Sequence, residues 1–575
     1  MLGFDWHAVG LPGQWPWSFY QRYPTAAWPW LCVLLGAACV GLRRREKTRR
    51  WLGSAHAWVE RRPWPWLLAL LIGMAALRAP HLDAPFTFDA LTQRLLFGSL
   101  DITDIIAHRY ADQRHPQLYY LLLHVFLWFG HGEAVARLPA LLLSLAAAAT
   151  LFALARPALG AVGALAATAL LGLNVSFLAF SREVGDLTLF CFLVLLSTLL
   201  LLRFLRTPRR RTAIGFAAAE VGMLYAYYLA PLVVCAHAVV LALHGRQRRH
   251  RDGWTALLAA LGLGVMALVD LVGLVRTDTG IRGVARVFPE HVWGERSMVE
   301  LWAQLGAHLA PSVELLLVVT LLTAAGVIRL APRPWRSPLA TAVVGITVLA
   351  TVAVGLAVPL VRLKPYYLLF VLPFLLLLVM AGCLGARSTG QPARATPNGD
   401  DRSGGWRAEL GSGVGVGLLA LLVGGYGADL AYRLDTTYQP FDAPRFRALG
   451  ERIRREPGPR VVIADPNSLH TILLYYGFPE PLAMYRTCAL PQDGGGTQCH
   501  YGDQHLVTLT ALPYMTEGWD QRSRQRFDEA RALGPSWVVY ATWFANEPLR
   551  EELDATCEVE ASYAKNHALL LYRCP

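Results

Sequence analysis

Long apolar stretches recur along the chain between Trp28 and Leu430, and short polar loops separate them. A membrane-spanning helix needs about 20 mostly apolar residues, because it crosses about 30 Å of hydrocarbon with a rise of about 1.5 Å per residue. Stretches that suit this length lie near residues 27–42, 64–79, 137–156, 161–178, 187–203, 212–229, 231–244, 255–275, 311–330, 338–360, 366–386 and 411–430. The pattern therefore predicts a polytopic α-helical membrane protein with about 12 spans.

Clusters of arginine and lysine between the apolar stretches predict their orientation. The clusters lie at residues 43–50, 206–211, 246–251, 333–336 and 387–407. Loops rich in positive residues stay in the cytoplasm, so we expect the N-terminus and everything after Tyr432 to lie outside. The apolar segment 116–130 would reverse this order if it crossed the membrane, and we interpret it as a re-entrant or surface-lying helix.

Two regions outside the apolar stretches differ in composition. Residues 387–410 are rich in glycine, proline, serine and arginine, which is typical of a flexible linker. From about Phe441 onward the pattern predicts strands at 460–464, 505–509 and 536–540 and helices at 444–456, 468–476 and 521–533, which indicates a small α/β domain. The expected organisation is an N-terminal span with a basic loop (1–63), a transmembrane catalytic core (64–386), the linker (387–410), a last span (411–432) and an extracytoplasmic domain (433–575).

Composition and charge agree with a membrane location. Hydrophobic residues make up 54% of the 575 residues and charged residues 16%, whereas soluble proteins carry about 25% charged residues. The net charge of +12 could suggest a nucleic-acid partner. However, the excess positive charge lies in the predicted cytoplasmic loops, and no basic face with interleaved aromatic residues exists elsewhere. We therefore expect a multi-pass membrane protein, surrounded by membrane lipids, with no nucleic-acid partner.

The cysteines divide in the same way as the hydrophobic pattern. Five of the nine lie in apolar stretches and have no metal-ligand spacing, as expected of small buried side chains. The other four, Cys488, Cys499, Cys557 and Cys574, lie in the predicted outside domain and suggest two disulfides. Proximity favours Cys488 with Cys499 and Cys557 with Cys574, the latter closing a terminal hairpin, although four cysteines permit three pairings.

The predicted outside loop 80–115 holds the richest set of charged residues. Asp89 lies between Phe86, Phe88 and Leu91 shortly after a span, so we expect a partly desolvated carboxylate whose pKa is raised toward that of a useful base. Asp112 is a further acidic residue of the same loop. The alternative for any one of these residues is an ordinary charge that solvates a loop.

Cations accompany these carboxylates on the predicted outer side. His115 precedes Pro116 at the start of the apolar segment, where helix N–H groups would favour an anion. Arg362 and Lys364 lie in an outside turn, against the positive-inside bias, which suggests ligands of a lipid phosphate; snorkelling anchors are the alternative. Glycosyl transfer from a polyprenyl phosphate sugar needs such a set, because the acceptor hydroxyl requires a base and the leaving phosphate requires cations or a metal.

Arg182 and Glu183 lie in the next outside loop. Glu183 and Asp186 are three residues apart and would share a helix face. A helix start stabilised by the helix dipole explains the two acidic residues equally well. In the functional interpretation, Arg182, Glu183 and Asp112 position the donor or the acceptor.

The motifs of the first half resemble the GT-C glycosyltransferases of family 39, which include protein O-mannosyltransferases and the aminoarabinose transferase acting on lipid A. The resemblance rests on an acidic residue after an early span, on His-Pro-x-Leu-Tyr-Tyr-Leu-Leu-Leu-His from residue 115, and on Gly-x-x-Glu-Ala-x-Ala-Arg-Leu-Pro-Ala-Leu at residues 130–141. It covers about residues 64–386, with Ser181-Arg182-Glu183 and the turn from Arg362 as weaker matches. The family's Asp-Glu pair is Asp89-Ala90 in this chain.

The resemblance implies a multi-span fold with juxtamembrane helices in the first large outside loop, a dolichyl- or undecaprenyl-phosphate sugar donor and inversion at the anomeric carbon. It also implies a bacterial inner membrane as the location, with the active site facing outside. It implies Asp89 at the catalytic acidic position, His115 at the cationic position, and Arg362 or Lys364 at the phosphate-binding turn. The acceptor would be a lipid, a glycan or a protein, and carboxylates beside the phosphate could also hold a divalent metal. Two other classes stay open: a transporter or flippase of lipid-linked sugars, for which Glu220 and Glu314 are the charges deep in spans, and an inactive envelope assembly protein.

Overall fold

A computed structural model describes most of the helices and the terminal sheet. It covers residues 46–80, 82–86, 98, 100–106, 116–244, 251–264, 313–330, 337–357, 365–384, 419, 421–427, 430, 446–455, 461–465, 476, 498–501, 504–508, 521–541, 547–563 and 569–575. The chain forms two compact units: Met1–Pro80, Ala140–Leu268 and Glu295–Tyr438 make the first, and His81–Pro139, Val269–Gly294 and Gln439–Pro575 the second.

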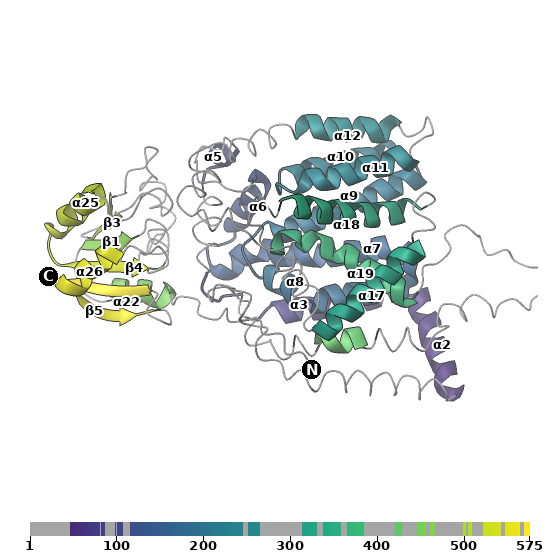
Figure 1. Ribbon diagram of the computed structural model, residues 1–575, viewed down its shortest axis with the longest axis horizontal. Helices are drawn as coiled ribbons and strands as arrows, with labels where there is room; N and C mark the ends of the chain where they lie inside the picture. The colour runs from purple at the N-terminus through teal and green to yellow at the C-terminus, as the bar shows by residue number, and fades with distance from the viewer. Residues whose placement is uncertain are drawn as a thin grey trace, which may run out of the picture. The chain divides into compact units, whose positions relative to one another are not determined.

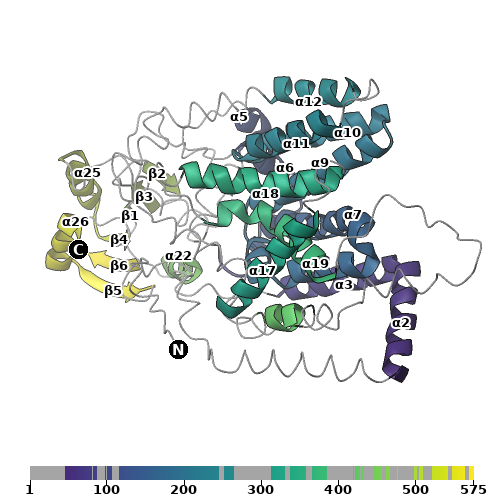
Figure 2. The same ribbon diagram turned by 45° about the vertical axis from the view of Figure 1, so that its right-hand side comes forward.

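The first unit is a helical bundle (Figures 1 and 2). Its described helices are α2 (Glu46–Arg61), α3 (Pro63–Arg78), most of α7 (Glu133–Leu173), α8 (Val175–Phe180), α9 (Leu187–Arg206), α10 (Arg210–Leu224), α11 (Ala230–His244), α12 (Arg251–Leu263), α17 (Val313–Leu330), α18 (Pro338–Ala357), the 3₁₀ helix η5 (Pro365–Val371) and α19 (Leu372–Leu384). Gly160 interrupts α7 with φ 75°, a conformation that glycine adopts without strain. The break separates the two stretches that the sequence predicts at 137–156 and 161–178.

By length and apolar composition, α7 and α9 are the two described helices that qualify as membrane spans. Shorter apolar helices, such as α3 and α11, coincide with other predicted spans. The predicted span at 27–42 lies outside the described residues, and the stretch 411–430 is described chiefly as a helical turn at 421–427. The fold is thus that of a polytopic helical membrane protein, while the total of about 12 spans stays a prediction.

Close backbone packing joins two of the shorter helices. A Cβ added at Gly326 of α17 would lie 2.0 Å from the Leu378 carbonyl oxygen of α19, and one added at Gly382 would lie 2.1 Å from the Leu322 carbonyl oxygen. Glycines at a helix interface let two backbones approach, which is how helices gain packing contacts where lipid provides no hydrophobic driving force. Larger residues at either position would force α17 and α19 apart.

In the second unit, helices from two distant segments accompany a sheet. The early segment contains α5 (Ile102–Ile106), α6 (Gln117–Leu127) and the first residues of α7. Helix α6 has 11 residues, about half of what crosses hydrocarbon, and it buries Tyr119, Tyr120 and Leu123. This length agrees with the predicted re-entrant or surface-lying helix.

The C-terminal sheet has six strands in the order β2-β3-β1-β4-β6-β5. The strands are β1 (Val461–Asp465), β2 (Gln498–Tyr501), β3 (Gln504–Thr508), β4 (Ser536–Ala541), β5 (Glu558–Ser562) and β6 (Leu569–Cys574). β1 pairs in parallel with β3 and β4, and the other pairs are antiparallel. Alternate residues of β1, β4 and β6 pack with α25 (Gln521–Arg531) and α26 (Glu547–Thr556) in one core.

The predicted elements of this domain correspond to part of the observed ones. The strands expected at 460–464, 505–509 and 536–540 are β1, β3 and β4, and the helices expected at 444–456 and 521–533 are α22 (Phe446–Arg455) and α25. Helix α26 and strand β2 have no counterpart in the sequence prediction. Of the helix expected at 468–476, only Tyr476 is described.

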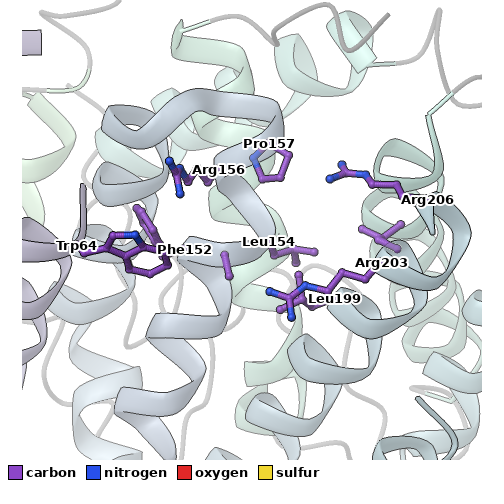
Figure 3. Close-up of a pocket in the computed structure, with 10 residues that line it drawn as sticks. Trp64, Phe152, Leu154, Arg156, Pro157, Leu199, Arg203 and Arg206 are labelled. Atoms are coloured by element: carbon purple, nitrogen blue, oxygen red, sulfur yellow. The ribbon is translucent and has the colours of Figure 1, made fainter. Parts of the chain in front are cut away.

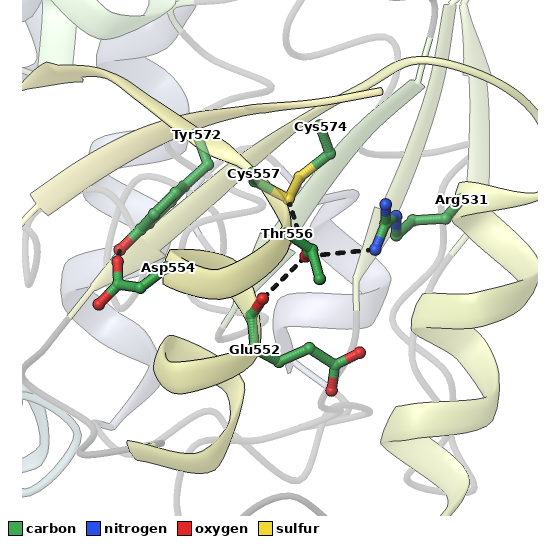
Figure 4. Close-up of a disulfide and its surroundings, with 7 residues drawn as sticks. All are labelled: Arg531, Glu552, Asp554, Thr556, Cys557, Tyr572 and Cys574. Carbon is green, nitrogen blue, oxygen red and sulfur yellow. Dashed lines mark hydrogen bonds between the residues drawn. A yellow bond between two sulfur atoms is a disulfide. The ribbon is translucent and has the colours of Figure 1, made fainter.

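A disulfide joins Cys557, at the end of α26, to Cys574 at the end of β6 (Figure 4). It is the pair that sequence proximity favours for the terminal hairpin. Asp554 accepts a hydrogen bond from the Tyr572 hydroxyl at 2.7 Å beside it, and burial together with this hydrogen bond raises the pKa of Tyr572. Cys488 and the side chain of Cys499 lie outside the described residues, so their pairing stays a prediction.

Removing the disulfide is expected to loosen β6. The bond closes a separation of 17 residues, for which the loss of chain entropy in the unfolded state predicts about 3 kcal/mol of stabilisation. The variant Cys557→Ser/Cys574→Ser should therefore exchange the β6 amide hydrogens about 100-fold faster. Hydrogen exchange followed by mass spectrometry measures this rate, and the amides of α9 serve as the internal control. Unchanged exchange in β6 would contradict the prediction.

Candidate functional site

The structure describes two of the predicted site residues and the segments that flank the others. Arg182 and Glu183 are described, whereas Asp89, Asp112, His115, Arg362 and Lys364 lie outside the described residues. The backbone just before Asp89 is described as far as Phe86, three residues earlier in the sequence. What holds this segment in place is therefore the part of the site that can be built from contacts.

A buried arginine of α7 holds the segment 82–86. The Arg137 guanidinium donates hydrogen bonds to the carbonyl oxygens of Leu82, Ala84 and Pro85 at 2.7, 2.6 and 3.1 Å. Its central carbon also lies 5.0 Å from the centre of the Phe86 ring, and Arg137 is 4% exposed. The planar fork of arginine suits several acceptors at once, so one side chain fixes the loop backbone that leads to Asp89.

The C-terminal domain contributes a second set of contacts to the same segment. Arg447 of α22 donates to the Asp83 carbonyl oxygen and to Glu133 Oε1, both at 2.6 Å. The Tyr476 hydroxyl donates to Glu133 Oε1 at 3.2 Å and accepts a hydrogen bond from the Phe86 backbone N–H at 2.9 Å. Partial burial lowers the pKa of Arg447, but the hydrogen bond and charge of Glu133 outweigh it and raise this pKa overall. We call residues Arg137, Glu133, Arg447 and Tyr476 the loop clamp.

Within the first unit, the Arg182 side chain binds the backbone just after α3. Its guanidinium donates to the Pro80 carbonyl oxygen at 2.6 Å, and the side chain is 7% exposed. Glu183 is half-buried, and Asp186 is buried at the N-cap of α9 without a capping hydrogen bond from its side chain. The contact to Pro80 links the loop of Arg182 to the end of α3, which fits a positioning role better than direct chemistry.

Two helix starts near the predicted site have different caps. Pro116 is the N-cap residue of α6, and the helix begins at Gln117, so the proline lies one position before the expected first helical position. Asn174 is 3% exposed and accepts the Phe177 backbone N–H at 2.9 Å as the N-cap of α8. Its side chain is therefore used for capping.

Metal ligands do not gather in the described part of the chain. Among those residues, no three side chains of histidine, cysteine, aspartate or glutamate lie close enough to hold an ion. Asp89, the position at which a metal role was left open, lies outside that part.

A polar network joins α9, α10 and α11 inside the bundle. His237 Nδ1 lies 2.6 Å from Glu220 Oε1, and His237 Nε2 lies 2.9 Å from the Thr198 hydroxyl. The Thr198 hydroxyl also lies 2.7 Å from the Val194 carbonyl oxygen, so its proton goes to that oxygen or to Nε2 according to the tautomer of the ring. Glu220 and His237 are fully buried and are each other's hydrogen-bond partners, as buried polar groups require. Glu220, one of the charges that favoured a transporter, thus serves a contact between helices.

Breaking this pair should destabilise the bundle. The variant His237→Leu leaves the Glu220 carboxylate buried without its partner, which costs about 3–5 kcal/mol. We expect His237→Leu to aggregate at a lower midpoint temperature than the wild type when heated in detergent. The double variant Glu220→Leu/His237→Leu, in which both polar groups are gone, should recover most of this decrease in midpoint temperature. A single variant as stable as the wild type would show that the pair contributes nothing to packing.

Comparison with known proteins identifies the architecture. Residues 114–269 match the family model of dolichyl-phosphate-mannose-protein mannosyltransferases. The structure of ArnT from Cupriavidus metallidurans in the apo state matches 90% of this chain and 98% of that chain, with a TM-score of 0.53 and 14% sequence identity. The chain has the fold of the GT-C glycosyltransferases. The resemblance stated from the sequence motifs is thereby confirmed, and the GT-C fold implies a location in the membrane.

Two further solved structures are similar to the chain. ArnT from Cupriavidus metallidurans bound to undecaprenyl phosphate covers 88% of this chain and 98% of its own, with 15% identity and a TM-score of 0.48. The oligosaccharyltransferase of Archaeoglobus fulgidus tethered with an acceptor peptide covers 90% of this chain and 74% of its own, with 10% identity and a TM-score of 0.49. No curated protein matches the sequence.

Sequence reasoning missed the loop clamp. Glu133 and Arg137 lie inside the motif at residues 130–141 that carried the resemblance, but the motif does not indicate which backbone they hold. Arg447 and Tyr476 lie more than 300 positions from their partners in the early loop. An arginine buried at the start of an apolar helix was the available signal, because a charge at that depth requires partners.

Proposed function

We propose that the protein transfers a sugar from a polyprenyl-phosphate-sugar donor to an acceptor hydroxyl outside the cytoplasm, with inversion at the anomeric carbon. The observation that carries this proposal is the match of residues 114–269 to a family whose description includes a dolichyl-phosphate sugar donor. This region begins one residue before His115 and contains the motif with Glu133 and Arg137. The GT-C fold and the loop clamp support it independently.

In the proposed reaction, Asp89 takes the proton of the acceptor hydroxyl as its oxygen attacks the anomeric carbon. The bond between that carbon and the phosphate oxygen breaks on the opposite face, which inverts the configuration. The leaving polyprenyl phosphate gains negative charge, and cations placed before the reaction stabilise it. His115, Arg362 and Lys364 are proposed for this role, with Arg182, Glu183 and Asp112 positioning the substrates.

The loop clamp holds the segment that precedes the proposed base in the sequence, which supports the role proposed for Asp89. A catalytic group displaced by about 1 Å costs about 100-fold in rate, and a loop between a span and a soluble segment has many conformations in isolation. Arg137 and Arg447 together donate four hydrogen bonds to backbone carbonyls of the segment 82–86, and Arg447 is itself held by Glu133. Such restriction is the kind of preorganisation that a general base requires.

Sugar transfer in reconstituted vesicles tests the proposal. Purified protein is incubated with dolichyl- or undecaprenyl-phosphate sugars of several kinds and with membrane extract as the source of acceptor. Mass spectrometry then measures free polyprenyl phosphate and the glycosylated product, with and without EDTA to show whether a divalent metal takes part. Movement of the lipid-linked sugar across the vesicle membrane without any glycosylated product would instead favour a flippase. Absence of both transfer and transport would favour an assembly role.

A further inference from the structure

A cavity lined by three arginines lies where α3, α7 and α9 meet (Figure 3). Its volume is about 230 Å³, and its lining combines Arg156, Arg203 and Arg206 with apolar residues. The apolar part is formed by Trp64, Phe152, Ala153, Leu154, Pro157, Leu199 and Leu202. Three positive side chains and a set of apolar side chains therefore line the same cavity, and all of them belong to the first unit.

The helix ends at this cavity belong to the predicted cytoplasmic side. Helix α3 begins at Pro63, the first leg of α7 ends before Gly160, and α9 ends at Arg206 next to the basic cluster 206–211. The sequence predicts each of these ends to be cytoplasmic, and the structure brings them together. The residues of α9 that line the cavity run from Leu199 to Arg206, so the cavity lies about 20–30 Å along this helix from Asp186 at its N-cap. It is therefore separate from the proposed site of sugar transfer.

The three arginines lack acidic partners within the described part of the chain, since no ion pair there involves them. Glu60 is the nearby acidic residue, and its Oε1 accepts the backbone N–H groups of Ala161 and Val162 at 2.8 and 3.3 Å. It stabilises the second leg of α7 in this way. The positive charge around the cavity is thus left for a ligand.

The arrangement of the side chains favours an anion beside an apolar chain. Figure 3 shows Arg203 and Arg206 extending from α9 toward α7, while Arg156 lies beside Trp64. The central carbon of Arg156 is 5.8 Å from the centre of the Trp64 ring, and that ring packs edge-on to Phe152 at 5.8 Å. Trp64 is 60% exposed. Tryptophan prefers the level of the lipid headgroups, and arginine binds phosphate oxygens with its planar fork.

We propose that this cavity binds the headgroup phosphate of an anionic phospholipid of the cytoplasmic leaflet. Arg203 and Arg206 hold the phosphate oxygens, Arg156 completes the cation set, and an acyl chain lies along the exposed side chains of Trp64 and Pro157. Arginines that only snorkelled to the surface would spread over it, whereas these three line one cavity from two helices. The lipid would then link the kink of α7 to the end of α9 and stabilise the bundle.

Native mass spectrometry of the full chain, purified in detergent, tests the proposal. Dioleoyl-phosphatidylglycerol is titrated into the wild type and into Arg156→Gln/Arg203→Gln/Arg206→Gln. The matched control is Arg209→Gln/Arg210→Gln/Arg211→Gln, which removes the same charge from three exposed arginines at the start of α10. Dioleoyl-phosphatidylcholine and undecaprenyl phosphate are titrated in parallel, and size-exclusion chromatography with circular dichroism verifies the fold of each variant.

We expect phosphatidylglycerol binding to weaken about 10- to 100-fold in the cavity variant, because each basic residue near a lipid surface contributes about a factor of 5. The control variant should stay within about threefold of the wild type, and phosphatidylcholine should bind weakly to all three proteins. An equal loss of phosphatidylglycerol affinity in both variants would show a general attraction of the lipid to positive charge, and it would overturn the proposal. Unchanged binding in the cavity variant, or loss of undecaprenyl phosphate binding alone, would overturn it as well. Sugar transfer is not part of the readout, so failure here is distinct from failure of the proposed function.

Discussion

Asp89→Asn is expected to reduce sugar transfer at least about 100-fold while the protein stays folded. A general base typically contributes about 100- to 10,000-fold, and the amide of asparagine cannot accept the proton of the acceptor hydroxyl. The side chains are nearly equal in size, so the loop backbone at 82–86 should keep its contacts with Arg137 and Arg447. Product formation under saturating donor measures the loss as a change in kcat.

The control for this result is Asp101→Asn, an exposed carboxylate of the same loop that precedes α5. Its activity should stay within about twofold of the wild type, since surface substitutions away from special features have small effects. Binding of the polyprenyl phosphate should be similar in both variants, because the proposed phosphate ligands are His115, Arg362 and Lys364. Near wild-type turnover in Asp89→Asn would remove Asp89 from the catalytic role.

Arg137→Lys is expected to lower kcat about 100-fold through the position of the loop that leads to Asp89. Lysine keeps the positive charge but lacks the planar fork that reaches the Leu82, Ala84 and Pro85 carbonyls together. At least two of these carbonyls then lose a charge-assisted hydrogen bond, each worth about 1.5–3 kcal/mol. Initial rates at saturating donor and acceptor measure the effect.

If Arg137→Lys displaces the loop before Asp89 and leaves the chemistry of the base unchanged, the kinetics should show this. The pH dependence of kcat in Arg137→Lys should keep the shape of the wild type, because Asp89 is still the titrating base. Arg447→Lys should show the same pattern with a smaller loss, since Arg447 holds one carbonyl of the segment and Arg137 holds three. Arg210→Lys, at an exposed position of α10, is the control. Full activity in Arg137→Lys would show that the clamp has no catalytic consequence.

Several features follow from the sequence alone, because they depend on local pattern. The length of the apolar stretches predicted the helices that appear as α3, α9, α11 and α18, because each of these helices is a continuous run of mostly apolar residues. The motif at residues 115–141 was enough to indicate the GT-C fold, which the family model and the ArnT structure support. The pair Cys557 and Cys574 was favoured by proximity, because a short hairpin brings neighbouring cysteines together.

The tertiary structure decided what depends on distant segments. Sequence could not show that Arg447 and Tyr476 hold the loop before Asp89, because no periodic pattern relates positions more than 300 residues apart. It suggested Glu220 as a transport charge, but His237 lies against it once α10 and α11 pack. It interpreted Arg203 and Arg206 as orientation signals, and the fold adds Arg156 and an apolar floor to them. Hydrophobic length determines which segments enter the membrane, whereas the partner of each buried or converging charge is determined only when the helices pack.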